Sequence, residues 1–230
     1  MKNPIIIAIV AASVLFQSCA SIAPSVPNVI IPQEKGEINI SASAGLPNLS
    51  ANASVAVSKN VAIVGSVNGS LGLLGDTRLG YEGGVQFNKF LSKNVAISAT
   101  PSYSFGNWEN TTHLIITNVF SKGNWNAKSL FVQSQYFFTN EKNNKLSIGG
   151  GVRVTHTSQF EKAIESKIGK PMYATSIEPI GMLIMEHKNF GMFLMGGFDA
   201  QSTTGNENEN EILDRSPIIL SAGINFKIGQ

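Results

Sequence analysis

The sequence predicts an all-β fold, an antiparallel up-and-down transmembrane β-barrel of about ten strands. Three observations predict this fold: apolar and small polar residues alternate with a period of two, short turns alternate with long loops, and the polar face carries almost no charge. Because successive side chains of a strand face opposite sides, this alternation gives each strand one apolar and one polar face. Only a short stretch, residues 159–168, could form a helix.

The alternation is clearest over residues 38–46 and 49–57, where every second residue is apolar. We expect strands at residues 37–46, 49–57, 61–69, 79–90, 95–106, 128–139, 145–157, 173–186, 189–201 and 216–229. Residues 111–121 could add a further strand pair and make twelve strands. We interpret them as a hairpin-like extension of the third outer loop.

Turn chemistry sets the order of these strands. A Lys-Asn pair lies between successive strands at residues 59–60, 93–94, 142–143 and 188–189. Asparagine tolerates the left-handed conformation of tight turns, and lysine keeps the turn in water. The connections at 69–78, 106–128, 158–172 and 201–215 are longer. Transmembrane barrels alternate short periplasmic turns with long outer loops in this way, and an even strand number puts both ends of the barrel in the periplasm.

The distribution of charge indicates which face looks inward. Asp, Glu, Lys and Arg make up 14% of the chain, against about 25% in a typical soluble domain. A soluble barrel would carry these residues on its polar face, whereas here that face carries Ser, Gly, Asn, Thr and Gln. Small polar side chains suit a narrow lumen, and apolar side chains suit lipid. Aromatic residues near strand ends suit the girdles at the two interfaces: Tyr81, Phe87, Phe90, Tyr103, Phe105, Tyr136, Phe138, Tyr173 and Phe198.

Two features fit a closed barrel less well. Pro101 and Pro179 fall inside predicted strands, where a closed barrel offers no free edge, and we expect bulges to absorb them. Residues 177–185 are apolar on both faces. This stretch predicts either a dry plug in the lumen near the periplasmic end or a wall that meets a partner.

The N-terminus has the features of a secretory signal peptide. Lys2 precedes an apolar run, residues 4–16, which is shorter than the roughly 20 residues of a membrane-spanning helix. The order Phe16-Gln17-Ser18 before Cys19, the only cysteine of the chain, resembles the lipobox of bacterial lipoproteins, although Phe16 and Gln17 depart from the usual aliphatic and small residues.

The lipobox resemblance implies a diacylglyceryl group on the sulfur of Cys19, which would be the new N-terminus. Residues 1–18 would then be the signal peptide, 19–36 a lipidated extended tether and 37–230 the barrel. On this interpretation the lipid is a second anchor or an aid to sorting. The alternative is an ordinary signal peptide cut nearby, for instance after Ala20, with Cys19 lost.

The C-terminal strand carries a second resemblance. Gly223, Phe226 and Ile228 resemble the terminal signal by which barrel proteins are recognised for outer-membrane assembly, although this chain ends Ile-Gly-Gln and not on an aromatic residue. As a whole, the chain resembles the small outer-membrane β-barrel lipoproteins of Gram-negative bacteria. The resemblance implies a cell outer-membrane localisation, both lipid-anchored and inserted.

The resemblance also implies the partners, which are outer-membrane lipid and the barrel-assembly and lipoprotein-sorting machineries. An unknown surface or envelope protein is a further partner that the sequence leaves open. A net charge of +2 is too small to indicate nucleic acid. We expect no cofactor.

Several charged and amide residues belong to the polar, inward set: Glu82, Gln86, Gln133, Gln135, Arg153, Glu178 and Asp199. A charge in a narrow lumen is costly unless it is paired, and the strand of Arg153 is next to the strand of Glu178. We interpret the set as an ion-pair and hydrogen-bond network that closes the interior, because side chains fill small barrels. The alternative is a selective pore or ligand pocket.

No catalytic or metal-binding constellation emerges. His113, His156 and His187 are not spaced as metal ligands, and His156 beside Ser158 is expected by chance in a serine-rich chain. We therefore expect no enzyme. Three functions stay open: a structural or envelope barrel that can display its loops for surface recognition, a small-solute or lipid-handling channel, and a soluble lipocalin-like lipoprotein that binds an apolar ligand.

Overall fold

The computed structural model describes residues 29–46, 49–71, 76–113, 118–139, 144–162, 172–204 and 218–228. Its strands are β1 (Ile38–Leu46), β2 (Leu49–Ser58), β3 (Val61–Leu71), β4 (Asp76–Phe90), β5 (Val95–His113), β6 (Asn118–Thr139), β7 (Asn144–Lys162), β8 (Met172–His187), β9 (Phe190–Phe198), β10 (Ala200–Thr204) and β11 (Ile218–Ile228). No helix in these ranges is long and apolar enough to cross a membrane.

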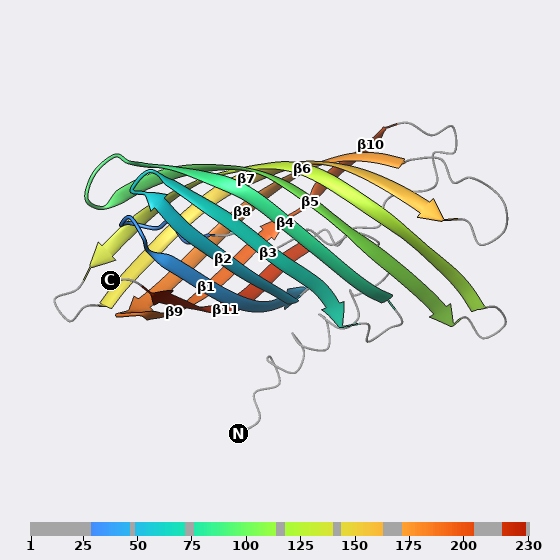
Figure 1. The fold of residues 1–230 in the computed structure, drawn as a ribbon, viewed down its shortest axis with the longest axis horizontal. Coiled ribbons are helices and arrows are strands. Elements are labelled where there is room, and N and C mark those ends of the chain that lie inside the picture. The colour runs from blue at the N-terminus through green and yellow to red at the C-terminus, as the bar shows by residue number, and fades with distance from the viewer. Residues whose placement is uncertain are drawn as a thin grey trace, which may run out of the picture.

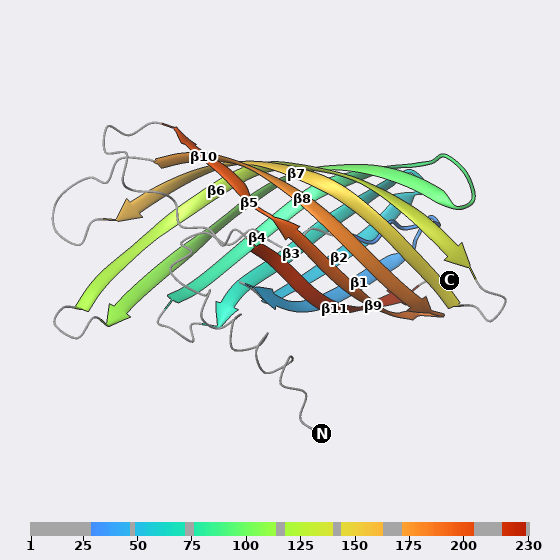
Figure 2. The same ribbon diagram turned by 180° about the vertical axis from the view of Figure 1, so that it is seen from behind.

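The strands form one closed antiparallel barrel with up-and-down order. Each strand from β1 to β8 pairs with the next, β11 pairs with β1 and β9, and the pairing of β8 with β9 closes the ring. Ile180 lies opposite Gly197, and Ile177 lies opposite Ala200 in the same register, so β9 and β10 are one barrel strand interrupted at Asp199. The barrel therefore has ten strands, as predicted, and they tilt around a common axis (Figure 1 and Figure 2).

The ladder between β5 and β6 is longer than predicted. Residues 107–113 and 118–127 continue these strands up to the pair His113 and Asn118, and β5 ends and β6 begins at the right-hand side of Figure 1. The prediction of a loop at 106–128 is therefore wrong for these residues. The alternative of twelve strands is also wrong, because these residues lengthen β5 and β6 and do not form two further strands. The interpretation as a hairpin-like extension is confirmed. Residues 159–162 of the possible helix are strand, since they pair with β6, and the rest of that segment lies outside the described residues.

The two faces of the barrel are distributed as the alternation predicts. Large apolar side chains of every strand from β1 to β9 and of β11 are exposed on the outer wall, for example Ile63, Val132 and Leu194. Buried Ser, Asn, Thr and Gln side chains line much of the inner wall. A soluble lipocalin-like barrel requires the opposite arrangement.

The outer wall of β6, β7 and β8 carries an apolar belt, interrupted by Ser134, over residues 130–138, 146–154 and 177–185. At about 3.3 Å per residue and a tilt of about 40°, strand segments of this length cover roughly 20 Å of a bilayer. This height is close to the apolar band of roughly 25 Å in outer-membrane barrels.

Val132 lies within this belt, and its side chain is 48% exposed. Val132→Arg is expected to destabilise the barrel by about 2–4 kcal/mol in lipid, because the charge would face hydrocarbon. Leu91, in the turn after β4, is 57% exposed, and Leu91→Arg should cost roughly 0–1 kcal/mol near the interface. Urea unfolding in lipid vesicles measures both values. Equal costs for the two variants would mean that this wall does not face lipid.

The predicted aromatic girdle is also largely on the outer wall. Tyr81, Phe87, Tyr103, Phe105, Tyr136, Phe138, Tyr173 and Phe198 are all exposed. Phe90 is the exception, because it packs partly buried against Ile31, Ala96 and Phe137. The Nζ atom of Lys59 lies 5.5 Å from the centroid of its ring. Phe90 therefore belongs to the interior at the short-turn end.

The two prolines are accommodated without the bulges that we expected. The β4–β5 ladder skips the positions around Pro101 but resumes in the same register, and the β8–β9 and β8–β10 ladders do the same around Pro179. Each proline keeps a residue opposite it on its other side, Leu130 and Val152. Because proline has no N–H to donate, a local gap on one side is sufficient.

Candidate functional site: the barrel lumen

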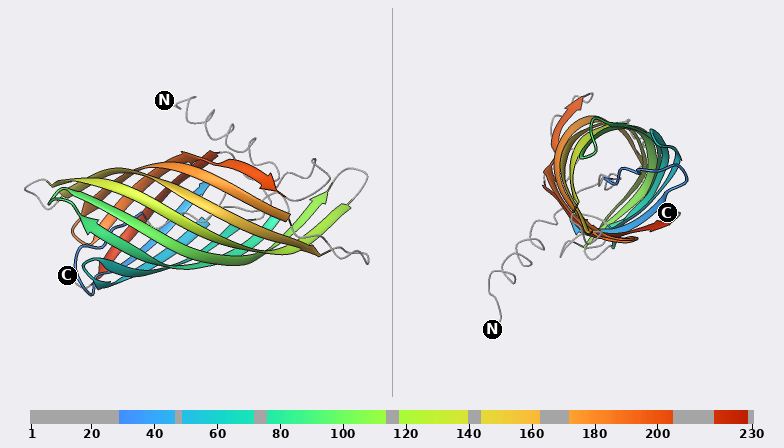
Figure 3. Two further views of the ribbon diagram at one scale, coloured as in Figure 1. Left: turned by 90° about the horizontal axis from the view of Figure 1, so that it is seen from above. Right: turned by 90° about the vertical axis from the view of Figure 1, so that its left-hand side faces the viewer.

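The described part of the predicted tether lies inside the barrel. Val29, Ile30, Ile31 and Pro32 are all buried, and we call these four residues the N-terminal plug. The end-on view in Figure 3 shows this blue segment within the ring of strands, before the chain turns into β1. The lumen is therefore occupied by the protein's own chain.

One side of the lumen is apolar and packs on the plug. Val29 and Ile30 form one buried cluster with Phe131, Ile180, Met182, Ile184, Phe193, Met195 and Ile219. Ile31 packs with Ala96 and Phe137 in a second cluster. This packing explains why residues 177–185, apart from Glu178, are apolar on both faces: the outer face is part of the exposed apolar wall, and the inner face meets the plug. Burial of each such side chain contributes roughly 1.5–3 kcal/mol.

Glutamine side chains from the wall bind the backbone of the plug. Gln86 Nε2 donates a hydrogen bond to the carbonyl oxygen of Ile30 at 3.3 Å, and Gln135 Nε2 donates to the carbonyl oxygen of Val29. Gln135 also donates to Gln133 Oε1 at 3.1 Å. A buried backbone carbonyl needs a donor, and the side chains of the wall supply it here. The structure thus gathers Gln86, Gln133 and Gln135 around the plug.

The connection from the plug to β1 is held by Glu37, which is completely buried. Its carboxylate accepts hydrogen bonds from the backbone N–H groups of Gln33 at 2.8 Å and Glu34 at 3.3 Å, and from the Asn39 amide at 3.0 Å. Gly36 has a φ of 85°, in the left-handed region that favours glycine. Together these contacts turn the chain from the lumen into the wall.

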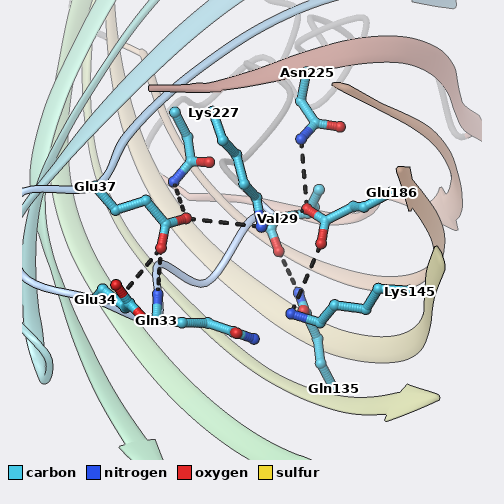
Figure 4. A network of polar contacts seen from close by, with 10 residues as sticks. Val29, Gln33, Glu34, Glu37, Gln135, Lys145, Glu186, Asn225 and Lys227 are labelled. Carbon is cyan, nitrogen blue, oxygen red and sulfur yellow. Dashed lines mark hydrogen bonds and ion pairs between the residues drawn. The ribbon is translucent and has the colours of Figure 1, made fainter. Parts of the chain in front are cut away.

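Glu37 also joins a largely buried cluster of charges (Figure 4), which consists of Glu37, Lys145, Glu186 and Lys227. Lys227 Nζ lies 2.8 Å from Glu186 Oε1 and 3.7 Å from Glu37 Oε1, and Lys145 Nζ lies 3.7 Å from Glu186 Oε2. The cluster contains equal numbers of positive and negative groups, so each buried charge has an opposite charge nearby. It ties the base of the plug to β7, β8 and β11.

The charge cluster was not predicted from the sequence, and a dry plug was predicted only as one alternative for residues 177–185, without residues 29–32 as its source. A signal for the cluster was present, because the alternation puts Lys145, Glu186 and Lys227 on inward positions at the short-turn ends of their strands. A signal for the plug was also present in the apolar run Val29-Ile30-Ile31, upstream of the first strand. The ring closes between β1 and β11, which brings Lys227 close to Glu37 and so connects the cluster to the base of the plug.

Arg153 and Glu178 lie opposite each other on β7 and β8 and form a buried ion pair. Arg153 Nε lies 2.6 Å from Glu178 Oε2, and a second guanidinium nitrogen contacts the same carboxylate. Ser176 donates a hydrogen bond to Glu178 Oε1 at 3.1 Å. Asp199 is half-buried at the break between β9 and β10, across from this part of β8.

Glu82 is half-buried on β4. Its carboxylate accepts a hydrogen bond from Ser102 Oγ on β5, whose hydroxyl lies 2.6 Å from Ser129 Oγ on β6. Glu82 is thus part of a hydrogen-bonded row that crosses three strands.

The residues of the C-terminal signal lie on both faces of β11. Phe226 and Ile228 are exposed on the outer wall, and the Phe226 ring centroid is 5.3 Å from that of Phe190. Gly223 faces the lumen, where a Cβ atom would lie 2.5 Å from the ring of Phe193 and from the Ala42 carbonyl oxygen. Gly223 therefore leaves room for an aromatic side chain of the apolar cluster. Cys19 lies outside the described residues.

The histidines do not form a catalytic group in the described structure. His156 is exposed on the outer wall, its Nδ1 lies 3.1 Å from Thr175 Oγ1, and its ring stacks on Tyr173. His187 ends β8 and His113 ends β5. Among the described residues, no three or more His, Cys, Asp or Glu side chains are grouped so that they could hold a metal ion.

No family model matches the chain, and no curated protein matches it significantly. Among solved structures, the chain is similar to the N-terminal β-barrel domain of Pseudomonas aeruginosa OprF, with 11% identity, a TM-score of 0.32 and coverage of 85% of this chain and 100% of that one. The KdgM porin in complex with disordered oligogalacturonate has 9% identity and a TM-score of 0.36, with coverage of 84% and 99%. Vibrio cholerae OmpT, an outer membrane protein, has 8% identity and a TM-score of 0.18, with coverage of 84% and 96%.

Proposed function

We propose that the protein is an outer-membrane β-barrel lipoprotein with a closed lumen, which serves envelope structure or surface recognition through its outer loops and performs no catalysis. The observation that supports this proposal most strongly is the N-terminal plug. A channel needs a continuous aqueous path, whereas this lumen holds a chain segment, an apolar cluster and buried ion pairs.

Conductance in planar lipid bilayers tests the proposal. The native protein is expected to insert without stepwise conductance, because the plug and the Arg153–Glu178 pair lie in the lumen. A known porin in the same chamber controls for bilayer quality, and heat-modifiable gel mobility confirms that the added protein is folded. Regular conductance steps from the native protein would contradict a closed lumen.

A second candidate function is a small-solute or lipid-handling channel that opens when the plug leaves. The observation that favours it is the inner wall of β1, β2 and β5, which is lined by small polar side chains: Asn39, Ser41, Ser43, Ser50, Asn52, Ser54, Ser98 and Thr100. Such a wall would suit water. On this account the native protein conducts only after a signal withdraws residues 29–32.

We also propose that Cys19 carries a diacylglyceryl group and that the barrel-assembly and lipoprotein-sorting machineries handle the chain. The partial lipobox supports the first point, and the pattern of Gly223, Phe226 and Ile228 supports the second. A fatty-acid analogue should label the native chain but not Cys19→Ala. Both proteins should be recovered in the outer-membrane fraction, because the barrel is an anchor by itself. Equal labelling of both would disprove lipidation at Cys19.

A further inference from the structure

Among the side chains that the structure describes, those on the outer wall of the strands carry almost no charge, and Lys128 and His156 are the exceptions away from the short-turn end. Lys89 and His187 lie at that end, close to the turns that follow β4 and β8. Lys128 on β6 and His156 on β7 lie elsewhere, on the side of the apolar belt that faces the long loops, and they are directly opposite each other in the ladder.

These two residues belong to a polar patch on neighbouring strands. We call it the Lys128 patch, and it consists of Asn126, Lys128, His156, Ser158 and Thr175. Lys128 and His156 are exposed, and Asn126, Ser158 and Thr175 are half-buried. None of the five is acidic, and all five can donate hydrogen bonds. The patch is therefore complementary to an anion.

The ring of His156 is held in place by its neighbours. Its Nδ1 lies 3.1 Å from Thr175 Oγ1, and its plane stacks on Tyr173 with an interplanar angle of 9° and a centroid distance of 6.2 Å. This arrangement leaves Nε2 for a ligand. Tyr103 lies opposite Lys128 on the other side, so exposed tyrosines flank the patch, as aromatic residues do at the level of lipid headgroups.

Directly below the patch, toward the short turns, lies an apolar row. Leu130, Val154 and Ile177 are opposite one another on β6, β7 and β8, and they are 45%, 42% and 51% exposed. A cationic, donor-rich patch above an apolar row matches a molecule with an anionic head and an acyl chain. The patch also lies at the edge of the belt, where lipid headgroups would be.

We propose that the Lys128 patch binds the phosphate group of a lipid in the leaflet on the long-loop side. The Lys128 ammonium and His156 Nε2 contact the phosphate, Asn126 and Ser158 add hydrogen bonds, and the acyl chain lies along Leu130, Val154 and Ile177. This site rests on the proposed membrane insertion.

Native mass spectrometry of the folded protein in detergent, titrated with dioleoyl phosphatidic acid or dioleoyl phosphatidylcholine, tests the site. The native protein should bind phosphatidic acid preferentially, and the double variant Lys128→Gln with His156→Gln should bind it about tenfold more weakly. Lys89→Gln is the matched control, since Lys89 is an exposed lysine of the outer wall at the opposite end, and it should retain the preference.

Three results would overturn the site: no preference in the native protein, an unchanged preference in the double variant, or an equal loss in Lys89→Gln. Inorganic phosphate lacks an acyl chain, so it should compete at least about tenfold less well than phosphatidic acid. Equal competition would overturn the choice of a lipid. Flotation with phosphatidylcholine vesicles tests insertion separately, so a failure of the proposed function is distinguishable from a failure of this site.

Discussion

Replacing Val29, Ile30 and Ile31 together with glycine is expected to open the barrel to ions. The three side chains are almost completely buried, and each contributes roughly 1.5–3 kcal/mol by its burial. Glycine residues also lose more conformational entropy when the segment becomes ordered, so the ordered plug is further destabilised. The segment should therefore leave the lumen for most of the time, and planar bilayers should show conductance steps that the native protein lacks.

The matched control is the pair Glu34→Gly and Lys35→Gly. Both residues belong to the same segment but are exposed, so the double variant should stay closed. Heat-modifiable mobility should show that both proteins are folded. A triple-glycine variant that folds, inserts and stays as closed as the native protein would show that other parts of the chain close the lumen.

Arg153→Ala is expected to cause the second large effect, a loss of about 3–5 kcal/mol in the free energy of unfolding. The substitution would leave the carboxylate of Glu178, which is fully buried, without its opposite charge. Urea unfolding of the refolded protein in vesicles measures the loss, and bilayer recordings measure any change in conductance.

The control for Arg153→Ala is the double variant Arg153→Met with Glu178→Met. Removing both charges while keeping apolar volume should cost much less than removing one, because no charge is left unpaired. A large rise in conductance of Arg153→Ala at unchanged stability would instead indicate that the pair gates a pore.

The fold was predictable because a strand has a period of two. The alternation along the chain, clearest in residues 38–46 and 49–57, together with the turns and long loops, placed ten strands and assigned their faces. Strand ends were less predictable. β5 continues to residue 113 and β6 begins at residue 118 because the two strands pair with each other there. This pairing leaves little trace in the sequence, since the segment is rich in Asn and has no clear alternation.

The contents of the lumen were only partly predictable. Periodicity places Arg153 and Glu178 on inward positions of neighbouring strands, where the structure joins them. It does not show that the apolar inner face of Ile180 and Met182 packs on Val29 and Ile30, because the plug is far away in sequence and has no strand period of its own. The link from Glu37 to Lys227 likewise depends on ring closure.

Chemical cross-linking of the plug to the wall tests the central claim most directly, namely that residues 29–32 occupy the lumen. In a Cys19→Ala background, Ile30→Cys is combined either with Gln86→Cys, which replaces the inward residue that binds the Ile30 carbonyl, or with Phe87→Cys, whose side chain is exposed on the outer wall. A short bismaleimide applied to the membrane-inserted protein should cross-link the first pair and not the second. Equal cross-linking of both pairs, or of neither, would contradict a plugged barrel.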